Sequence, residues 1–276
     1  MIELPEALAR ADELGKILSG KKALKVYPPS SPHKFCWFNG DAALYNKMLK
    51  GKAVMGTEGF GIFAEIKFDG GIRLCINDGV NPRIFRTDDQ VPEKYQLRID
   101  FTDGYVLIFT VAMYGAISCF DGNYDNEYYE ISRKGISPLS TEFNYPFFRE
   151  LFDSVKPNSS VKALLATKQR IPGLGNGVLQ DILFEAGIHP KRKIGTLPER
   201  EKERIFASIK EVLSEMVRLG GRDTEKDIWG NSGGYKTKLS KNTYKKGCPK
   251  CGGEIIKATY LGGTVYFCPV CQPLDV

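Results

Sequence analysis

The sequence contains little of what several classes of protein require. It has only two histidines, His33 and His189, and neither is spaced to share a metal ion with a second ligand, which disfavours catalysis by a histidine-bound metal. No uninterrupted apolar run approaches the roughly 18 residues of a membrane span. The first residues do not form a basic and then apolar leader, and internal repeats are lacking. We therefore expect a globular cytoplasmic protein without a membrane partner.

The positive charge is unevenly distributed along the chain. The net charge is +6, and residues 218–257 contain ten Lys or Arg against four Asp or Glu. Such a segment favours a polyanionic partner such as nucleic acid, although surplus lysines can also serve only to keep a protein soluble.

Four of the seven cysteines form two Cys-x-x-Cys pairs near the end of the chain. The pairs are Cys248 with Cys251 and Cys268 with Cys271, and 16 residues separate them. This is the spacing of a four-thiolate zinc site. Two disulfides are the alternative, but the other cysteines stand singly in apolar surroundings and no secretory signal is present. We predict one structural Zn²⁺ ion, with a β-hairpin between the two pairs.

The N-terminal half has the pattern of a helix followed by strands. Residues 5–19 carry leucine and alanine at helical spacing, and Pro5 suits a first turn. From residue 23 to 120 the period changes to two. Strand-like runs are expected at residues 24–27, 61–68, 72–76, 95–101 and 105–111. Because no helix is expected between them, the pattern predicts a β-sandwich or barrel and disfavours a parallel α/β fold.

The second half is expected to be mostly helical. Residues 121–158 show little periodicity and suggest a domain boundary. Helices are predicted at 161–168, 177–186 and 198–219, and a mobile loop at 220–235.

A glycine-rich elbow, Ile171–Asn176, lies between the first two of these helices. Gly173 and Gly175 would let the backbone approach a phosphate closely, and Asn176 could present its amide to an anion at the start of the next helix. Ordinary turn and capping roles are the alternative.

Together these parts resemble the formamidopyrimidine-DNA glycosylase and endonuclease VIII family over nearly the full length. The resemblance rests on the Met-x-Glu-Leu-Pro-Glu start, the elbow, Ala186-Gly-Ile-His-Pro190 and the cysteine pairs ending at Gln272. It implies an α+β multidomain fold with an N-terminal β-sandwich, a helix-two-turn-helix domain and a zinc finger. We place these domains at residues 1–130, 131–240 and 241–276.

The resemblance also implies a function. Members of the family flip a damaged base out of the duplex and attack C1′ of its sugar with the N-terminal amine, forming a Schiff base that leads to strand cleavage. This protein would then be a monomeric DNA-repair glycosylase with possible AP lyase activity on damaged or abasic duplex DNA, located in the cytoplasm and on the nucleoid when bound. Glu3 and Glu6 match the family's acidic pair, of which the first acts as general acid or base and the second positions the N-terminus. Two acids near a helix N-terminus are the plainer interpretation.

The sequence departs from the family at the nucleophile. The family's second residue is usually proline, exposed once methionine is removed, whereas here Ile2 follows Met1. Because the aminopeptidase prefers a small second residue, we expect Met1 to be retained. Its primary amine could still form an imine, but the extra residue displaces it by up to about 3.5 Å.

Other departures concern contacts to DNA. The first hairpin, residues 56–63, contains no Lys or Arg, and Gly262-Gly263-Thr264 stands where the family has an arginine. Val80, Met113 and Tyr114 occupy the segments that fill the gap left by a flipped base, although such residues in a β-domain are often core.

These observations leave three hypotheses open. The first is a DNA glycosylase of altered specificity that uses Met1, or a water activated by Glu3. The second is a non-catalytic zinc-finger binder of abasic or distorted DNA. The third is a zinc-dependent module for protein or RNA.

Overall fold

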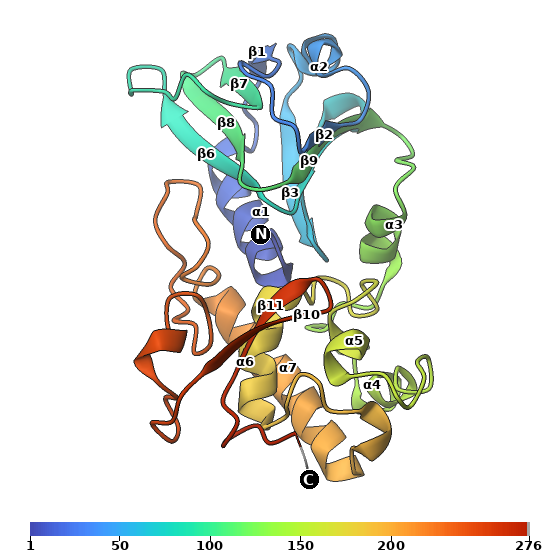
Figure 1. Ribbon diagram of the computed structural model, residues 1–276. Coiled ribbons are helices and arrows are strands. Elements are labelled where there is room, and N and C mark those ends of the chain that lie inside the picture. Colours follow the sequence, from blue (N-terminus) through green and yellow to red (C-terminus); the bar gives the residue numbers. More distant parts are fainter. Residues whose placement is uncertain (275–276) are drawn as a thin grey trace.

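The computed structural model describes residues 1–274, and its first element is helix α1 (Leu4–Leu18). The backbone N–H of the N-cap residue Glu3 donates to Oε2 of Glu6 at 3.2 Å. This N–H has no partner within the helix itself, so the bond stabilises the start of α1. Leu14 packs in the β-sandwich core, whereas Leu4 packs among the helices. Helix α1 therefore belongs to two cores (Figure 1).

Two β-sheets enclose the first core, which confirms the predicted β-sandwich. The four-stranded sheet has the order β1-β7-β8-β6, and the five-stranded sheet has the order β2-β9-β5-β4-β3. Neighbouring strands are antiparallel except for β2 and β9, which are parallel. The strands are β1 (Ala23–Tyr27), β2 (Cys36–Phe38), β3 (Val54–Phe60), β4 (Phe63–Phe68), β5 (Ile72–Asn77), β6 (Val80–Arg86), β7 (Leu97–Phe101), β8 (Tyr105–Val111) and β9 (Gly115–Asp121).

Four of these strands, β2, β3, β6 and β9, lie outside the predicted runs. Strand β3 contains two glycines, β6 contains a proline, and β2 has only three residues, so each has a weak strand signal. The expectation that no helix separates the strands was wrong, because the short helix α2 (Tyr45–Leu49) lies between β2 and β3.

The second core is built from helices α4 to α7, whereas α3 packs its Tyr129 with Phe63 and Phe120 of the β-sandwich. Helix α7 buries Ile205, Ile209 and Leu213 against this core, as its apolar face predicts. Helices α3 and α4 lie in the stretch where little order was expected, and both begin at an asparagine whose side chain accepts a hydrogen bond from the third helical residue. The helices are α3 (Glu127–Lys134), α4 (Tyr145–Glu150), α5 (Val161–Leu165), α6 (Asn176–Ala186) and α7 (Glu199–Arg218).

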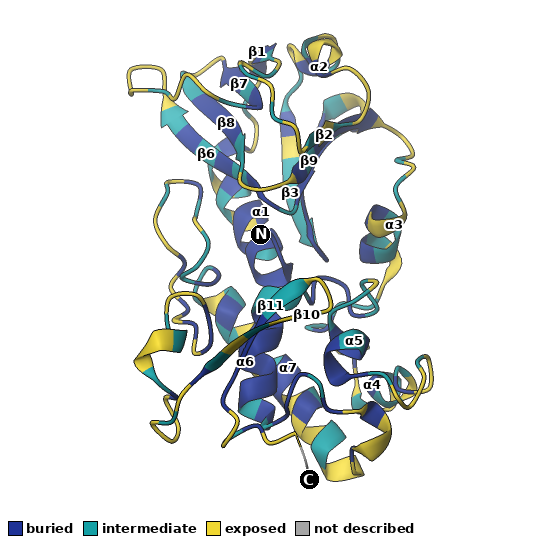
Figure 2. Cartoon of the chain, viewed as in Figure 1, coloured by how far each residue is buried: buried dark blue, intermediate teal, exposed yellow. Residues whose placement is uncertain are grey.

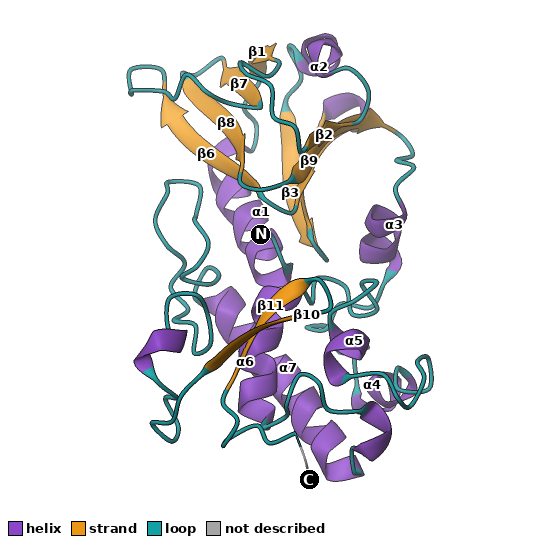
Figure 3. Ribbon diagram, in the orientation of Figure 1, coloured by secondary structure: helices purple, strands orange, loops and turns teal. Residues whose placement is uncertain are grey.

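The C-terminal segment forms what we call the cysteine hairpin, residues 248–272. Its antiparallel strands β10 (Ile256–Tyr260) and β11 (Gly263–Phe267) cross helix α6 (Figures 1 and 3). Gln180 of α6 donates to the carbonyl of Thr264 at 3.1 Å and accepts from the N–H of Tyr266 at 3.0 Å. Buried Gln272 donates to the carbonyl of Ile188 at 2.9 Å. The hairpin is therefore fixed to the helical core at both ends.

Residues 220–235, expected to be mobile, are held by hydrogen bonds. Tyr235 donates to the carbonyl of Gly221 at 3.0 Å, and Asp223 donates to the carbonyl of Tyr235 at 2.8 Å. Ile228 is buried in the β-sandwich core and Tyr235 in the helical core, so the segment joins the two cores. Figure 2 shows that helices α1 and α6, which lie beside these cores, are largely buried. Within residues 1–274, no helix is long and apolar enough to cross a membrane.

Candidate functional site

A pocket of about 700 Å³ lies where the β-sandwich, the helical core and the cysteine hairpin meet. The N-terminus, two loops of the sandwich, the elbow, the 222–226 segment and the hairpin all contribute to its wall. The residues that line the pocket include Met1, Glu3, Gly79, Arg83, Ala112, Met113, Asn176, Gly177, Arg222, Glu225, Lys226, Lys241, Thr264 and Tyr266.

The N-terminal amine lies in this pocket and is already paired. The nitrogen of Met1 lies 2.6 Å from Oε2 of Glu225. The backbone N–H of Ile2 donates to the carbonyl of Asp78 at 2.5 Å, and its side chain is buried in the β-sandwich core. Of the two predicted nucleophile positions, Met1 thus carries the N-terminal amine, and the buried Ile2 holds the backbone of Met1 in place.

Glu6 forms a buried ion pair with Arg222. The guanidinium group donates from Nη2 to Oε2 at 2.7 Å and from Nε to Oε1 at 3.0 Å, and the backbone N–H of Arg222 also donates to Oε1. Although burial raises the pKa of Glu6, Arg222 lowers it below the ordinary value. Arg222 also donates to the carbonyl of Met1 at 3.1 Å. Arg222 therefore links the Glu6 carboxylate to the backbone of Met1.

Glu3 caps helix α6. Its Oε1 accepts from the N–H of Gly177 and its Oε2 from the N–H of Val178, both at 2.7 Å, and Arg222 lies 3.5 Å away. Burial raises the pKa of Glu3, and Arg222 and the two amides oppose that rise. The anion-binding end of α6 is therefore occupied in large part by the protein's own carboxylate.

The elbow glycines are required by contacts within the chain. Gly173 has φ +79°, and a Cβ there would lie 2.5 Å from the carbonyl oxygen of Gly61 and from Cβ of Leu4. A Cβ on Gly175 would lie 2.5 Å from Oε1 of Glu3. These two glycines thus let the N-terminal segment and the first hairpin approach the elbow closely, where a phosphate was expected to do so.

Asn176 connects the elbow to the cysteine hairpin. Its Nδ2 donates to the carbonyl of Thr264 at 2.7 Å. Its buried Oδ1 has no hydrogen-bond partner among residues 1–274. The backbone N–H groups that donate to Glu3 are those of the next two residues, and Asn176 itself lines the pocket.

The three predicted wedge residues separate into two groups. Val80 is only 1% exposed and packs in the β-sandwich core, so its prediction as a wedge was wrong. Val80 is an apolar residue of strand β6, and such residues are ordinarily buried in the core. Met113 is 71% exposed and has φ +70°, and its neighbour Tyr114 is 37% exposed. Both lie in the loop before β9, where Met113 lines the pocket and Tyr114 follows it in the chain.

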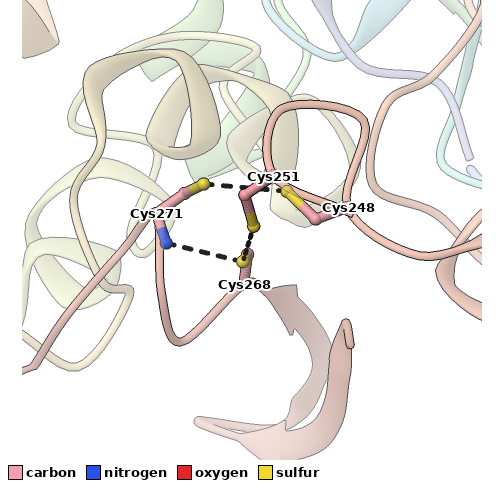
Figure 4. A group of neighbouring side chains, drawn as sticks. All are labelled: Cys248, Cys251, Cys268 and Cys271. Carbon is pink, nitrogen blue, oxygen red and sulfur yellow. Dashed lines mark hydrogen bonds between the residues drawn. The ribbon is translucent and has the colours of Figure 1, made fainter. Parts of the chain in front are cut away.

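The four cysteines of the two pairs converge (Figure 4). All four Sγ atoms lie within 4.8 Å of one another, with Cys248 3.7 Å from Cys271 and Cys251 3.6 Å from Cys268. Four sulfurs bound tetrahedrally at ~2.3 Å lie ~3.8 Å apart, whereas a disulfide requires ~2.05 Å. The cluster therefore fits a metal ion and excludes the disulfide alternative.

Three residues important in this site were not identified from the sequence: Arg222, Glu225 and Gly177. A Cβ on Gly177 would lie 1.5 Å from Nη1 of Arg222, so only glycine leaves room for the guanidinium group. Their partners lie more than 170 positions away in the chain, so no local pattern marks them.

Comparisons with known proteins agree with this architecture. Residues 135–227 match the model of the formamidopyrimidine-DNA glycosylase H2TH domain. The chain is 28% identical to the formamidopyrimidine-DNA glycosylase of Bacillus cereus over 99% of both chains. It is 31% identical to that of Wolbachia pipientis wMel over 82% of this chain and 84% of the relative.

Solved structures show the same likeness. Lactococcus lactis Fpg in complex with abasic-site DNA has a TM-score of 0.84 and 25% identity, covering 98% of this chain and 99% of that one. The MutM (Fpg) protein of Thermus thermophilus has a TM-score of 0.79 and 24% identity over 98% of both, which shows the shared fold. This chain belongs to the formamidopyrimidine-DNA glycosylase family.

Proposed function

We propose that this protein is a DNA-repair glycosylase that binds damaged or abasic duplex DNA across the interdomain pocket and cleaves an N-glycosidic bond there. The observation that carries the proposal is the position of the Met1 amine, which shares one pocket with the elbow and the cysteine hairpin. The relatives are named as glycosylases, and one similar structure was solved with abasic-site DNA.

The pocket has groups suited to holding DNA. Arg83, Lys226 and Lys241 line it and supply positive charge for phosphates. The N–H of Asn176 supplies a directed donor at a helix start. The four cysteines would hold one structural Zn²⁺ ion, which would fix the hairpin so that Thr264 stays against Asn176.

The chemistry proposed for the site follows from its carboxylates. As the base leaves with the bonding electrons, positive charge develops on C1′ and the ring oxygen, and the nearby carboxylate of Glu3 would stabilise it. Water then adds to C1′, and the proton it loses is taken up by the departing base. Because both Glu3 oxygens already accept backbone hydrogen bonds, its charge is held in a fixed place. Imine formation by Met1 would be weak, because its contact with Glu225 would have to break before the nitrogen could attack C1′.

The remaining parts of the proposal concern organisation. We divide the chain into a β-sandwich domain (1–130), a helix-two-turn-helix domain (131–240) and a zinc finger (241–276). We propose that it acts as a monomer in the cytoplasm and on the nucleoid when bound to DNA.

The test is borohydride trapping of the untagged protein on an abasic duplex, with the adduct mapped by mass spectrometry, beside a base-release assay on lesion-containing duplexes. Base release with a faint adduct at Met1 is the expected result. Failure to bind any duplex would overturn the proposal.

A second candidate function is non-catalytic binding of abasic or distorted DNA. It is favoured by the pairing of Met1 with Glu225 and by the first hairpin, where Glu58 forms ion pairs with Lys67 and Arg133. Tight binding without base release or adduct would select it.

A further inference from the structure

Three exposed aromatic rings form a continuous row on the β-sandwich. Phe35 and Trp37 have ring centroids 6.5 Å apart, and Trp37 and Tyr114 have centroids 6.4 Å apart. Phe35 is 47% exposed, Trp37 is 52% exposed and Tyr114 is 37% exposed. We call Phe35, Trp37 and Tyr114 the aromatic row.

The backbone fixes this row in place. Strand β2 is an outer strand of its sheet and pairs with β9, with Trp37 opposite Ala116 (Figure 1). The N–H of Gly115 donates to the carbonyl of Phe35 at 3.0 Å, and the carbonyl of Tyr114 accepts from Gly79 at 2.9 Å. The rings therefore stand on hydrogen-bonded strands and loops rather than on a loose segment.

The row is continuous with the interdomain pocket. Gly79 and Met113 line the pocket, and Tyr114 follows Met113 directly. The φ of +70° at Met113 is strained for a residue with a side chain, and such strain gathers at functional sites. The aromatic row thus begins at the pocket rim and leads away from it along β2.

Planar exposed rings beside a proposed DNA site suit one kind of ligand. Every nucleobase has a π face that stacks on aromatic side chains, and only an unpaired base leaves that face free. Nζ of Lys34 lies 5.4 Å from the Phe35 ring centroid, where its charge can meet the phosphate of the same nucleotide. This combination favours nucleic acid over an uncharged protein surface.

We propose that the aromatic row stacks on an unpaired nucleobase of DNA next to the lesion site, with Trp37 as the central ring. The inference rests on the proposed function, since it assumes that damaged DNA occupies the adjoining pocket. It adds a binding site for unpaired bases on the sandwich domain.

The first experiment compares Trp37→Ala and Trp37→Phe with Tyr128→Ala, a control at an aromatic residue that is 51% exposed on α3. Binding is measured to a fully paired duplex, to the same duplex with one abasic site, and to one with a short unpaired bubble. Loss of one stacking ring should weaken binding to the abasic and bubble duplexes about five- to 150-fold. Binding to the paired duplex should change less than about twofold, and Trp37→Phe should retain most of the affinity.

The second experiment uses fluorescence, because the chain has only two tryptophans. In a Trp229→Phe background, Trp37 is the sole tryptophan, and its emission should be quenched by the bubble duplex and not by the paired duplex.

The outcomes separate the two proposals. If the unmodified protein binds none of these DNAs, the proposed function fails. If it binds them but Trp37→Ala binds equally well and the emission is unchanged, the aromatic row alone is overturned. Self-association in sedimentation that Trp37→Ala abolishes would also overturn it, by assigning the row to a second copy of the chain.

Discussion

The amine nitrogen of Met1 lies 2.6 Å from Oε2 of Glu225. Both residues line the same pocket as the N-terminus of helix α6, which Glu3 caps. The N-terminal amine therefore lies in the pocket and is engaged by a carboxylate. Both partners are partly exposed, at 36% and 23%, so the pair contributes modestly to stability. Its main effect falls on the chemistry of the amine.

Glu225→Gln should increase imine formation. The amide keeps the size of the side chain but holds the amine by a weaker, uncharged contact, a loss of about 1 kcal/mol that corresponds to about fivefold more borohydride-trapped adduct. The measurement is adduct yield on an abasic duplex at pH 7 for the variant and the unmodified protein. Equal yields from both proteins at pH 7 would show that Glu225 does not restrain Met1.

Glu6→Gln should destabilise the fold in a pH-dependent way. Breaking a buried ion pair costs about 3–5 kcal/mol, because Arg222 is left without its full partner. Arg222 holds the pKa of Glu6 below its ordinary value of 4.5, so this stability is complete above pH 4.5 and is lost as the pH falls through the lower folded pKa. Thermal unfolding from pH 7 to 3 should show the two curves converging in acid, and parallel curves would refute the linkage.

Glu3→Gln should separate catalysis from binding. The amide has one acceptor oxygen in place of two, so the cap on α6 weakens by about 1 kcal/mol. Base release should collapse while affinity for abasic DNA stays within about threefold, because the charge beside the sugar is removed and the phosphate contacts remain. Unchanged base release, measured in single-turnover assays, would remove Glu3 from the mechanism.

Cys248→Ser should remove the metal and DNA binding together. The hairpin has a small apolar core, so we expect a bound metal to supply most of its stability. Metal analysis should fall from one zinc per chain to none, and a chelator should have the same effect. Cys36→Ser, at a cysteine outside the cluster, should keep both. Intact DNA binding after verified metal loss would contradict the role of the hairpin.

Asn176→Ala should weaken binding to all duplexes by a similar factor. The change removes the hydrogen bond to Thr264, worth about 1 kcal/mol, and loosens the contact between elbow and hairpin. Affinities for paired and abasic duplexes should both fall about fivefold. A loss confined to the abasic duplex would argue for contact with the lesion instead.

The sequence predicted those parts of the fold that local patterns encode. Helices α6 and α7 and the convergence of the cysteines follow from periodicity, glycine caps and spacing. Strand β6 was missed because Pro82 and alternating polar residues obscure its pattern. Pairs of residues far apart in the chain could not be predicted from the sequence. Nothing near Arg222 in the sequence indicates that it pairs with Glu6, or that Glu225 contacts Met1.

The exposure of side chains was equally hidden from the sequence. Val80 and Met113 are both apolar residues beside turns, yet one is buried in the core and the other extends into solvent. That difference depends on how the β5–β6 and β8–β9 loops pack against each other, through Gly79 and Tyr114. Such packing becomes visible only in three dimensions.

The Glu6–Arg222 pair also affects how the protein is made. Its two members are 216 positions apart, and helix α1, which carries Glu6, is synthesised first. At ribosomal rates of 5–20 residues per second, α1 waits about 10 to 45 s for its partner to emerge. During that interval Glu6 has no ion-pair partner, and the apolar face of α1 has no completed core to pack against. Variants that slow the emergence of the 220–235 segment should therefore reduce the yield of active protein without changing the stability of the molecules that complete folding.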